Sequence, residues 1–130
     1  MNKDALVEAA KKAMMKAYAP YSGFFVGAAI LCRNGKVYSG ANIENSSYGV
    51  TSCAERTALF SAVFDGERDF EAIAIVGGKG GEISEFCTPC GICRQALCEF
   101  CGPELNIYLY DGEKIKEYTL GELLPHGFSL

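Results

Sequence analysis

Cys53-Ala54-Glu55 and Pro89-Cys90-Gly91-Ile92-Cys93 are the two segments that most constrain the fold of this chain, because their three cysteines can share one metal ion. Zinc binds cysteine thiolates in a tetrahedral arrangement, and three protein ligands leave its fourth position open. An open position is typical of a catalytic zinc site, where a water molecule can bind. The two segments therefore predict zinc ligands at Cys53, Cys90 and Cys93, with Glu55 placed to act as acid and base.

Both cysteine segments lie at the start of a predicted helix, at 54–64 and at 91–100. Cys90 and Cys93 are three residues apart, so they share one face of a helix and can bind one ion. Cys53 and the glutamate two residues later would point in different directions from a regular helix, so we place Cys53 at the cap. Unpaired N–H groups at a helix start favour thiolate over thiol.

Charge gives a second criterion, because three thiolates around a zinc dication leave a net negative charge that weakens activation of water. Arg56 lies three residues after Cys53, on the same side of the helix start, and can donate hydrogen bonds to sulfur. We predict this supporting role for Arg56, with a solvated surface arginine as the alternative. Arg94, next to Cys93, is a second candidate for the same role.

Other potential ligands lie near these segments. Together with the last two predicted ligands, Cys98 and Cys101 form two C-x-x-C pairs, as in a structural four-cysteine zinc site. The spacer between such pairs is usually about 15–20 residues, and Cys98 would lie about 12 Å along the helix from Cys90. This argues against one shared ion. Cys87 stays open as a competing ligand, whereas we expect His126 to be an exposed loop residue.

Size and charge indicate a small-molecule partner. At 130 residues, 49% of them hydrophobic, the chain can build one core, and we expect a single domain over 1–130. Its 12 basic and 16 acidic residues give a net charge of −4 without any basic run, which argues against a nucleic-acid partner.

Cysteine usage indicates a reducing compartment. The chain has seven cysteines, an odd number, and no signal segment or apolar run of membrane-spanning length. We therefore expect a cytoplasmic protein with reduced thiols and no membrane contact.

Apolar periodicity and turn signals predict an α/β fold. The predicted helices cover 2–18, 54–64 and 91–100, and the predicted strands cover 24–33, 37–43, 72–76, 105–110 and 115–119. Asn34-Gly35 is a strong hairpin signal, 77–81 is predicted as a flexible glycine-rich loop, and 121–125 as a short last turn. Because helices alternate with strands after an initial hairpin, we expect a mixed five-stranded sheet covered by helices.

Several segments, in order along nearly the whole chain, closely resemble the small homotetrameric cytidine deaminases. They are Tyr21–Ala29, Asn42–Asn45, Cys53–Ala58, Pro89–Gln95 and Leu123–Pro125. The resemblance implies a three-layer α/β/α fold with one Zn²⁺ per subunit. It also implies hydrolytic deamination of cytidine and deoxycytidine in pyrimidine salvage, and a homotetramer whose pockets are shared between subunits. The alternatives are a deaminase of a related nucleoside or antibiotic, and a non-catalytic zinc-stabilised nucleoside-binding module.

Asn42 and Glu44 narrow the expected substrate to a nucleoside. They are two residues apart on a predicted strand, so both face the same side and present an amide donor and a carboxylate acceptor. This pair suits a sugar hydroxyl. The alternative is a pair of polar residues on a solvated strand face.

The resemblance implies further contacts with the substrate. Phe24 would form a wall against the pyrimidine, although it also suits a core position. The Ala54 N–H would bind the carbonyl oxygen of the base, and the Thr88 carbonyl would accept a hydrogen bond from its exocyclic amine. Tyr48 and Phe128 would reach the pocket from neighbouring subunits.

Overall fold

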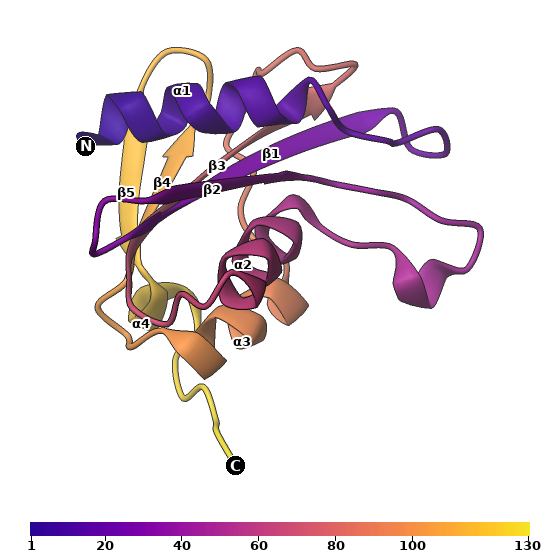
Figure 1. Ribbon diagram of the computed structural model, residues 1–130. Helices are drawn as coiled ribbons and strands as arrows, with labels where there is room; N and C mark the ends of the chain where they lie inside the picture. Colours follow the sequence, from indigo (N-terminus) through magenta and orange to yellow (C-terminus); the bar gives the residue numbers. More distant parts are fainter.

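The computed structural model describes residues 1–130, and its strands form one sheet with helices on both faces (Figure 1). In chain order the elements are α1 (Lys3–Met14), β1 (Phe24–Cys32), β2 (Val37–Ala41), a 3₁₀ turn (Tyr48–Val50), α2 (Ala54–Phe64), β3 (Phe70–Lys79), α3 (Gly91–Phe100), β4 (Asn106–Tyr110), β5 (Ile115–Thr119) and α4 (Leu120–Leu123). The five strands lie in the order β2-β1-β3-β4-β5. Only β3 and β4 pair in parallel, so the predicted mixed sheet is confirmed.

The inner strand β1 shows why both faces of the sheet are covered. Its side chains alternate between the faces, and apolar residues point both ways. Ala28 and Ile30 belong to a core shared with α2 and α3, whereas Ala29 and Leu31 belong to a second core shared with α1. The three-layer α/β/α arrangement is therefore confirmed, with α1 on one face and the other helices opposite (Figure 1). No helix is both long and apolar enough to cross a bilayer.

The helices α2 and α3 share one face of the sheet, and their first residues meet. α3 connects the parallel strands β3 and β4, since a parallel pair needs a crossover connection. The N-cap of α2 is Cys53 and the N-cap of α3 is Cys90. Their sulfur atoms lie 3.6 Å apart, although 37 residues separate them in the chain. The fold thus joins the two cysteine segments at adjacent helix starts.

Gly40 of β2 sets how closely α2 approaches the sheet. A Cβ atom at this position would lie 2.4 Å from the backbone nitrogen of Ala58 and 2.7 Å from the carbonyl oxygen of Ala54. Any larger residue would have to push the first turns of α2 outward. Because Cys53 caps this helix, the close packing at Gly40 also places one of the cysteines.

Three elements end earlier than predicted, although β1 stops only one residue short, at Cys32. α1 stops at Met14 rather than at Tyr18, and β2 stops at Ala41 rather than at Ile43. Tyr18 leaves the helix to form an isolated parallel bridge with Ile43, in which the Tyr18 N–H donates to the carbonyl of Asn42. A pairing between distant residues therefore overrides local helical periodicity at this point.

Most of the glycine-rich segment predicted as a flexible loop instead belongs to β3. Gly77, Gly78 and Lys79 pair with the first residues of β1, and the prediction of a loop was therefore wrong for these three residues. A Cβ at Gly78 would lie 1.8 Å from the carbonyl oxygen of Glu82, which explains a glycine within a strand. Only Gly80 and Gly81 form the turn, with positive φ angles of 62° and 86°.

We expect Gly40→Ala to lower the free energy of unfolding by about 1–3 kcal/mol, because the added methyl group displaces α2 from the sheet. Denaturant unfolding of the purified variant measures this change. Gly91→Ala is the matched control, since a Cβ there meets nothing within 4 Å and alanine suits a helix better than glycine. Equal stability of Gly40→Ala and the unaltered protein would contradict the packing described.

Candidate active site

Three cysteines form a compact group at the starts of α2 and α3. Cys53 and Cys90 are the N-cap residues of the two helices, and Cys93 lies in the first turn of α3. All three sulfur atoms lie within 4.8 Å of one another. The group thus joins the three cysteines predicted as ligands and contains none of the other four.

The spacing of these sulfur atoms suits a zinc ion. Tetrahedral zinc with Zn–S bonds of about 2.3 Å holds neighbouring sulfurs about 3.8 Å apart. Cys53 and Cys90 show 3.6 Å, far longer than the roughly 2.05 Å of a disulfide bond, and every cysteine of the chain is free. An all-sulfur donor set also favours zinc over magnesium or calcium.

Hydrogen bonds at the helix starts favour thiolates. The N–H of Cys93 points at the Cys90 sulfur from 3.4 Å. Hydrogen bonds from the Cys93 thiol and from the Arg56 guanidinium lower the pKa of Cys53 to about 5. The contact with Cys53, together with burial, raises the pKa of Cys93. The sulfur atoms thus compete for protons, which a bound dication would displace.

Arg56 places a positive charge against the cysteine group. Its Nη2 lies 3.5 Å from the Cys53 sulfur and donates to the carbonyl oxygen of Thr51 at 3.3 Å. Its Nε is buried and has no hydrogen-bond partner. A partly buried guanidinium is stabilised by a nearby anion, and the Cys53 thiolate is in contact with it.

Arg94, the second candidate for that role, contacts backbone rather than sulfur. Its Nε donates to the carbonyl oxygen of Pro89 and its Nη1 to that of Leu123, both at 2.7 Å. The side chain therefore ties the loop before α3 to the end of α4. This contact supports the position of Cys90, which directly follows Pro89.

Glu55 lies beside the cysteines in the first turn of α2 and is the only charged residue that is buried, with 4% of its surface exposed. Burial raises the pKa of its carboxyl group to about 7. A carboxyl group with a pKa near neutrality can both accept and donate a proton at neutral pH.

One pocket of about 270 Å³ joins most of the residues predicted to form the site. Those that line it are Asn42, Glu44, Cys53, Ala54, Glu55, Thr88 and Cys90. Cys93 lies beneath this pocket, fully buried. The segments before α2 and α3 thus form two walls of the pocket, and the residues that follow β2 form a third.

Two backbone groups in this pocket are free to bind a ligand. The Ala54 N–H is the first of α2, where the helix provides no acceptor, and it donates no hydrogen bond within the chain. The Thr88 carbonyl, on the opposite segment, accepts none. A free donor and a free acceptor in one pocket can bind a flat polar ring along its edge.

Asn42 and Glu44 follow β2 rather than lie within it, and both are half-buried. The amide of Asn42 pairs with the backbone of β1: its Nδ2 donates to the carbonyl oxygen of Phe24, and its Oδ1 accepts from the N–H of Val26, both at 2.8 Å. Glu44 accepts three hydrogen bonds from residues 21–22. Specific contacts therefore fix both side chains, unlike polar residues on a solvated strand face.

Three predicted substrate contacts lie outside this pocket. The ring of Phe24 packs near Gly77 and Cys87, because a Cβ at Gly77 would lie 3.1 Å from the ring and 3.0 Å from the Cys87 sulfur. Tyr48, in the 3₁₀ turn, is 85% exposed, and Phe128 is 64% exposed. Within a single chain, neither Tyr48 nor Phe128 reaches the cysteine group.

Cys87 lines the pocket but does not join the sulfur group, and burial raises its pKa to about 12. From the sequence, Cys87 was considered as a competing ligand, but its position in the wall of the pocket was not predicted. Its place directly before Thr88, a predicted substrate contact, could have indicated this position. His126 lines a separate hollow with Cys98 and Cys101, and these three residues do not form a metal-binding group.

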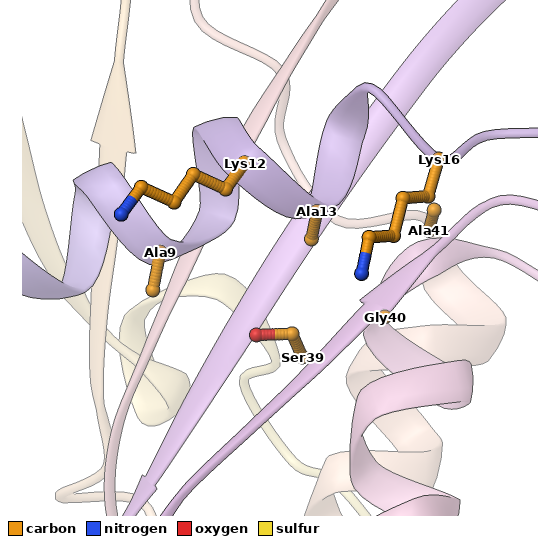
Figure 2. Close-up of a pocket in the computed structure, with 7 residues that line it drawn as sticks. All are labelled: Ala9, Lys12, Ala13, Lys16, Ser39, Gly40 and Ala41. Atoms are coloured by element: carbon orange, nitrogen blue, oxygen red, sulfur yellow. The ribbon is translucent and has the colours of Figure 1, made fainter.

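A further hollow, of about 260 Å³, lies between α1 and β2. Figure 2 shows Lys12 of α1 and Lys16, in the turn after α1, on either side of Ser39. It contains none of the predicted site residues, so the pocket above the cysteines is the candidate active site.

Comparisons with known proteins agree with this geometry. Residues 1–109 match the family described as "Cytidine and deoxycytidylate deaminase zinc-binding region". A cytidine deaminase of Sporosarcina psychrophila is 48% identical over 130 residues, which cover 99% of this chain and 93% of that protein. The chain therefore carries a zinc-binding region, and the group of three cysteines is placed to bind the ion.

Solved structures of cytidine deaminases also match the fold of this chain. The structure of cytidine deaminase from Burkholderia pseudomallei matches with a TM-score of 0.91 and 49% identity, covering 98% of this chain and 100% of that one. The cytidine deaminase of Mycobacterium tuberculosis matches with a TM-score of 0.84 and 40% identity, covering 100% and 99%.

We expect Cys93→Ala to lower the zinc content far below about one ion per chain, because three protein ligands are the minimum for a tightly held catalytic zinc. Elemental analysis of the purified variant measures this loss. Cys98→Ala is the matched control, as a cysteine of the same helix outside the sulfur group. Full zinc content in Cys93→Ala, or loss in Cys98→Ala, would show that the ion is bound elsewhere.

Proposed function

Because the chain belongs to the zinc-binding family of cytidine and deoxycytidylate deaminases, we infer that it hydrolyses cytidine to uridine and ammonia, and deoxycytidine in the same way. The observation that carries this inference is the pocket itself. It is lined by Cys53 and Cys90 of the three grouped cysteines, by one buried carboxyl group, and by a free backbone donor and acceptor. These are the groups needed to hold a cytosine ring and attack it with water.

Recognition of the base rests on backbone groups. The free N–H of Ala54 donates to the carbonyl oxygen of the pyrimidine, and the free carbonyl of Thr88 accepts from its exocyclic amine. Phe24, whose ring lies near Gly77 and Cys87 outside the pocket of the single chain, is the aromatic residue proposed to support the flat face of the ring. The amide of Asn42 and the carboxylate of Glu44 then bind the sugar hydroxyls from the opposite wall.

Glu55 moves the protons of the reaction. Zinc held by Cys53, Cys90 and Cys93 would supply Lewis-acid activation of water. Glu55 removes a proton from the water that adds to C4 of the ring and delivers it to N3, and it then transfers the remaining proton of the C4 hydroxyl to the departing amine. The C4–N bond breaks, and uridine and ammonia are released. A pKa near 7 suits the carboxyl group of Glu55 to both directions of transfer.

Arg56 compensates for the charge of the cysteine group. Three thiolates exceed the charge of one zinc dication, and the guanidinium in contact with Cys53 returns the site toward neutrality. A site nearer neutrality acidifies water more strongly than an anionic one.

We also propose a homotetramer in which Tyr48 and Phe128 complete the pockets of neighbouring subunits. Both side chains are exposed and lie outside the pocket of their own chain. Other large apolar side chains are exposed on α2 and α3, notably Phe60, Phe64 and Ile92. Large exposed apolar side chains of this kind are typical of an interface.

The reaction returns a nucleoside to the uridine pool, and we propose a role in pyrimidine salvage. The seven free cysteines favour a reducing compartment such as the cytoplasm.

Glu55→Gln should lower turnover of cytidine at least about a hundredfold while zinc content stays unchanged, because the amide cannot carry a proton. The absorbance change of cytidine gives the rate, with metal content measured on the same sample. Glu85→Gln, an exposed glutamate on the loop before α3, is the control and should keep its activity. Near-normal turnover by Glu55→Gln would rule out its role.

Substrate comparison separates the competing functions. Cytidine should react much faster than free cytosine, because Asn42 and Glu44 act only on the sugar; equal rates would remove that role. Turnover of a nucleoside antibiotic but not of cytidine would favour the related deaminases. Binding of cytidine and zinc without release of ammonia would indicate a non-catalytic module.

Mixed subunits test the shared pocket. Tyr48→Ala and Glu55→Gln should each be weakly active alone, whereas co-expression should restore part of the activity. In mixed tetramers, a Tyr48→Ala subunit keeps its own Glu55 and can receive an intact Tyr48 from a Glu55→Gln neighbour. Light scattering checks assembly of the 14.0 kDa chain. A fully active monomer, or no recovery of activity in verified mixed assemblies, would contradict the proposal.

A further inference from the structure

The carboxylate of Glu44 is held by the turn that leads into β1. Its Oε1 accepts hydrogen bonds from the N–H groups of Tyr21 at 2.9 Å and of Ser22 at 3.1 Å. Its Oε2 accepts a hydrogen bond from the Ser22 hydroxyl at 2.5 Å. The Ser22 hydroxyl is the main cause of a lowered pKa of Glu44, and the two N–H groups add to it. Glu44 is therefore held as an ionised acceptor.

Ser22 also contacts the start of β1. Its Oγ accepts the N–H of Phe24 at 3.0 Å while it donates its only hydrogen to Glu44. The carbonyl oxygen of Phe24 in turn accepts from the amide of Asn42 at 2.8 Å. A continuous series of hydrogen bonds thus runs from Glu44 through Ser22 and Phe24 to Asn42, and Ser22 links the Glu44 carboxylate to the start of β1.

We propose that Ser22 is a positioning residue for recognition of the sugar, because it fixes the Glu44 carboxylate relative to Phe24 and Asn42. This inference rests on the proposed function, in which Glu44 and Asn42 bind the sugar hydroxyls. Ser22 lines the neighbouring hollow with Glu44 and Tyr48 and does not line the pocket above the cysteines. It therefore acts through Glu44, rather than by touching the base.

A purely structural role for Ser22 would have a different consequence. If the hydroxyl only stabilised the turn, its loss would affect every substrate equally. If it orients Glu44, its loss would affect substrates only to the extent that they present sugar hydroxyls. Comparison of two substrates with the same base and different sugars separates these roles.

The test compares Ser22→Ala with the unaltered enzyme on cytidine and on dideoxycytidine, which lacks both ring hydroxyls of ribose. We expect the KM for cytidine to rise about five- to tenfold with kcat nearly unchanged, since one hydrogen bond to a charged group is lost. The kcat/KM for dideoxycytidine should change less than about twofold. Equal losses on both substrates, or no loss on cytidine, would overturn the proposal.

Three further variants sharpen the result. Ser39→Ala removes an exposed serine hydroxyl in the hollow between α1 and β2 (Figure 2) and should leave both substrates unaffected. Ser22→Thr keeps the hydroxyl at an exposed position and should preserve the preference for cytidine. The double variant Ser22→Ala with Glu44→Gln should lose no more than Glu44→Gln alone, because both act through one carboxylate. Multiplied losses, or a Ser22→Thr enzyme that resembles Ser22→Ala, would count against the role.

Zinc content and thermal unfolding are measured on every variant, so that a folding defect is recognised. An unaltered protein that does not deaminate cytidine would contradict the proposed function. An active unaltered protein with an unchanged Ser22→Ala variant would contradict only the role of Ser22.

Discussion

Three sulfur atoms placed to bind one ion constrain how the helices of this molecule lie on the sheet. Cys53 and Cys90 are 37 residues apart in the chain, yet their sulfurs lie 3.6 Å apart. This requires α2 and α3 to lie on the same face of the sheet with their first residues together. The crossover from β3 to β4 supplies α3 on that face, and the close approach of α2 to Gly40 of β2 supplies the other helix start.

The same site holds groups of opposite charge close together. Thiolates, a buried carboxyl group and a guanidinium lie within one small volume, and each alters the pKa of the others. Arg56 favours the thiolate of Cys53, whereas burial keeps the pKa of Glu55 near neutrality. A helix start can combine these properties because its N–H groups attract anions while its first turn is buried against the sheet.

The proposed recognition of the substrate depends largely on main-chain atoms and on side chains that the main chain holds in place. In our proposal the base meets the Ala54 N–H and the Thr88 carbonyl, and the sugar meets side chains fixed by β1 and by the turn before it. Such groups need little reorganisation when a ligand binds. The cost is a pocket wall made of loops, whose position depends on many weak contacts.

Local sequence was enough to predict the mixed sheet, helices 54–64 and 91–100, and the grouping of the three cysteines, because periodicity, helix caps and thiolate chemistry are properties of neighbouring residues. It could not predict that Gly77 to Lys79 continue β3 or that α1 ends at Met14, because both depend on pairing with distant segments. The link from Glu44 through Ser22 to Phe24 likewise required the turn before β1 to meet the residues that follow β2. The amino-acid sequence therefore determines which chemical groups are present, whereas their contacts across the sheet exist only once the chain has folded.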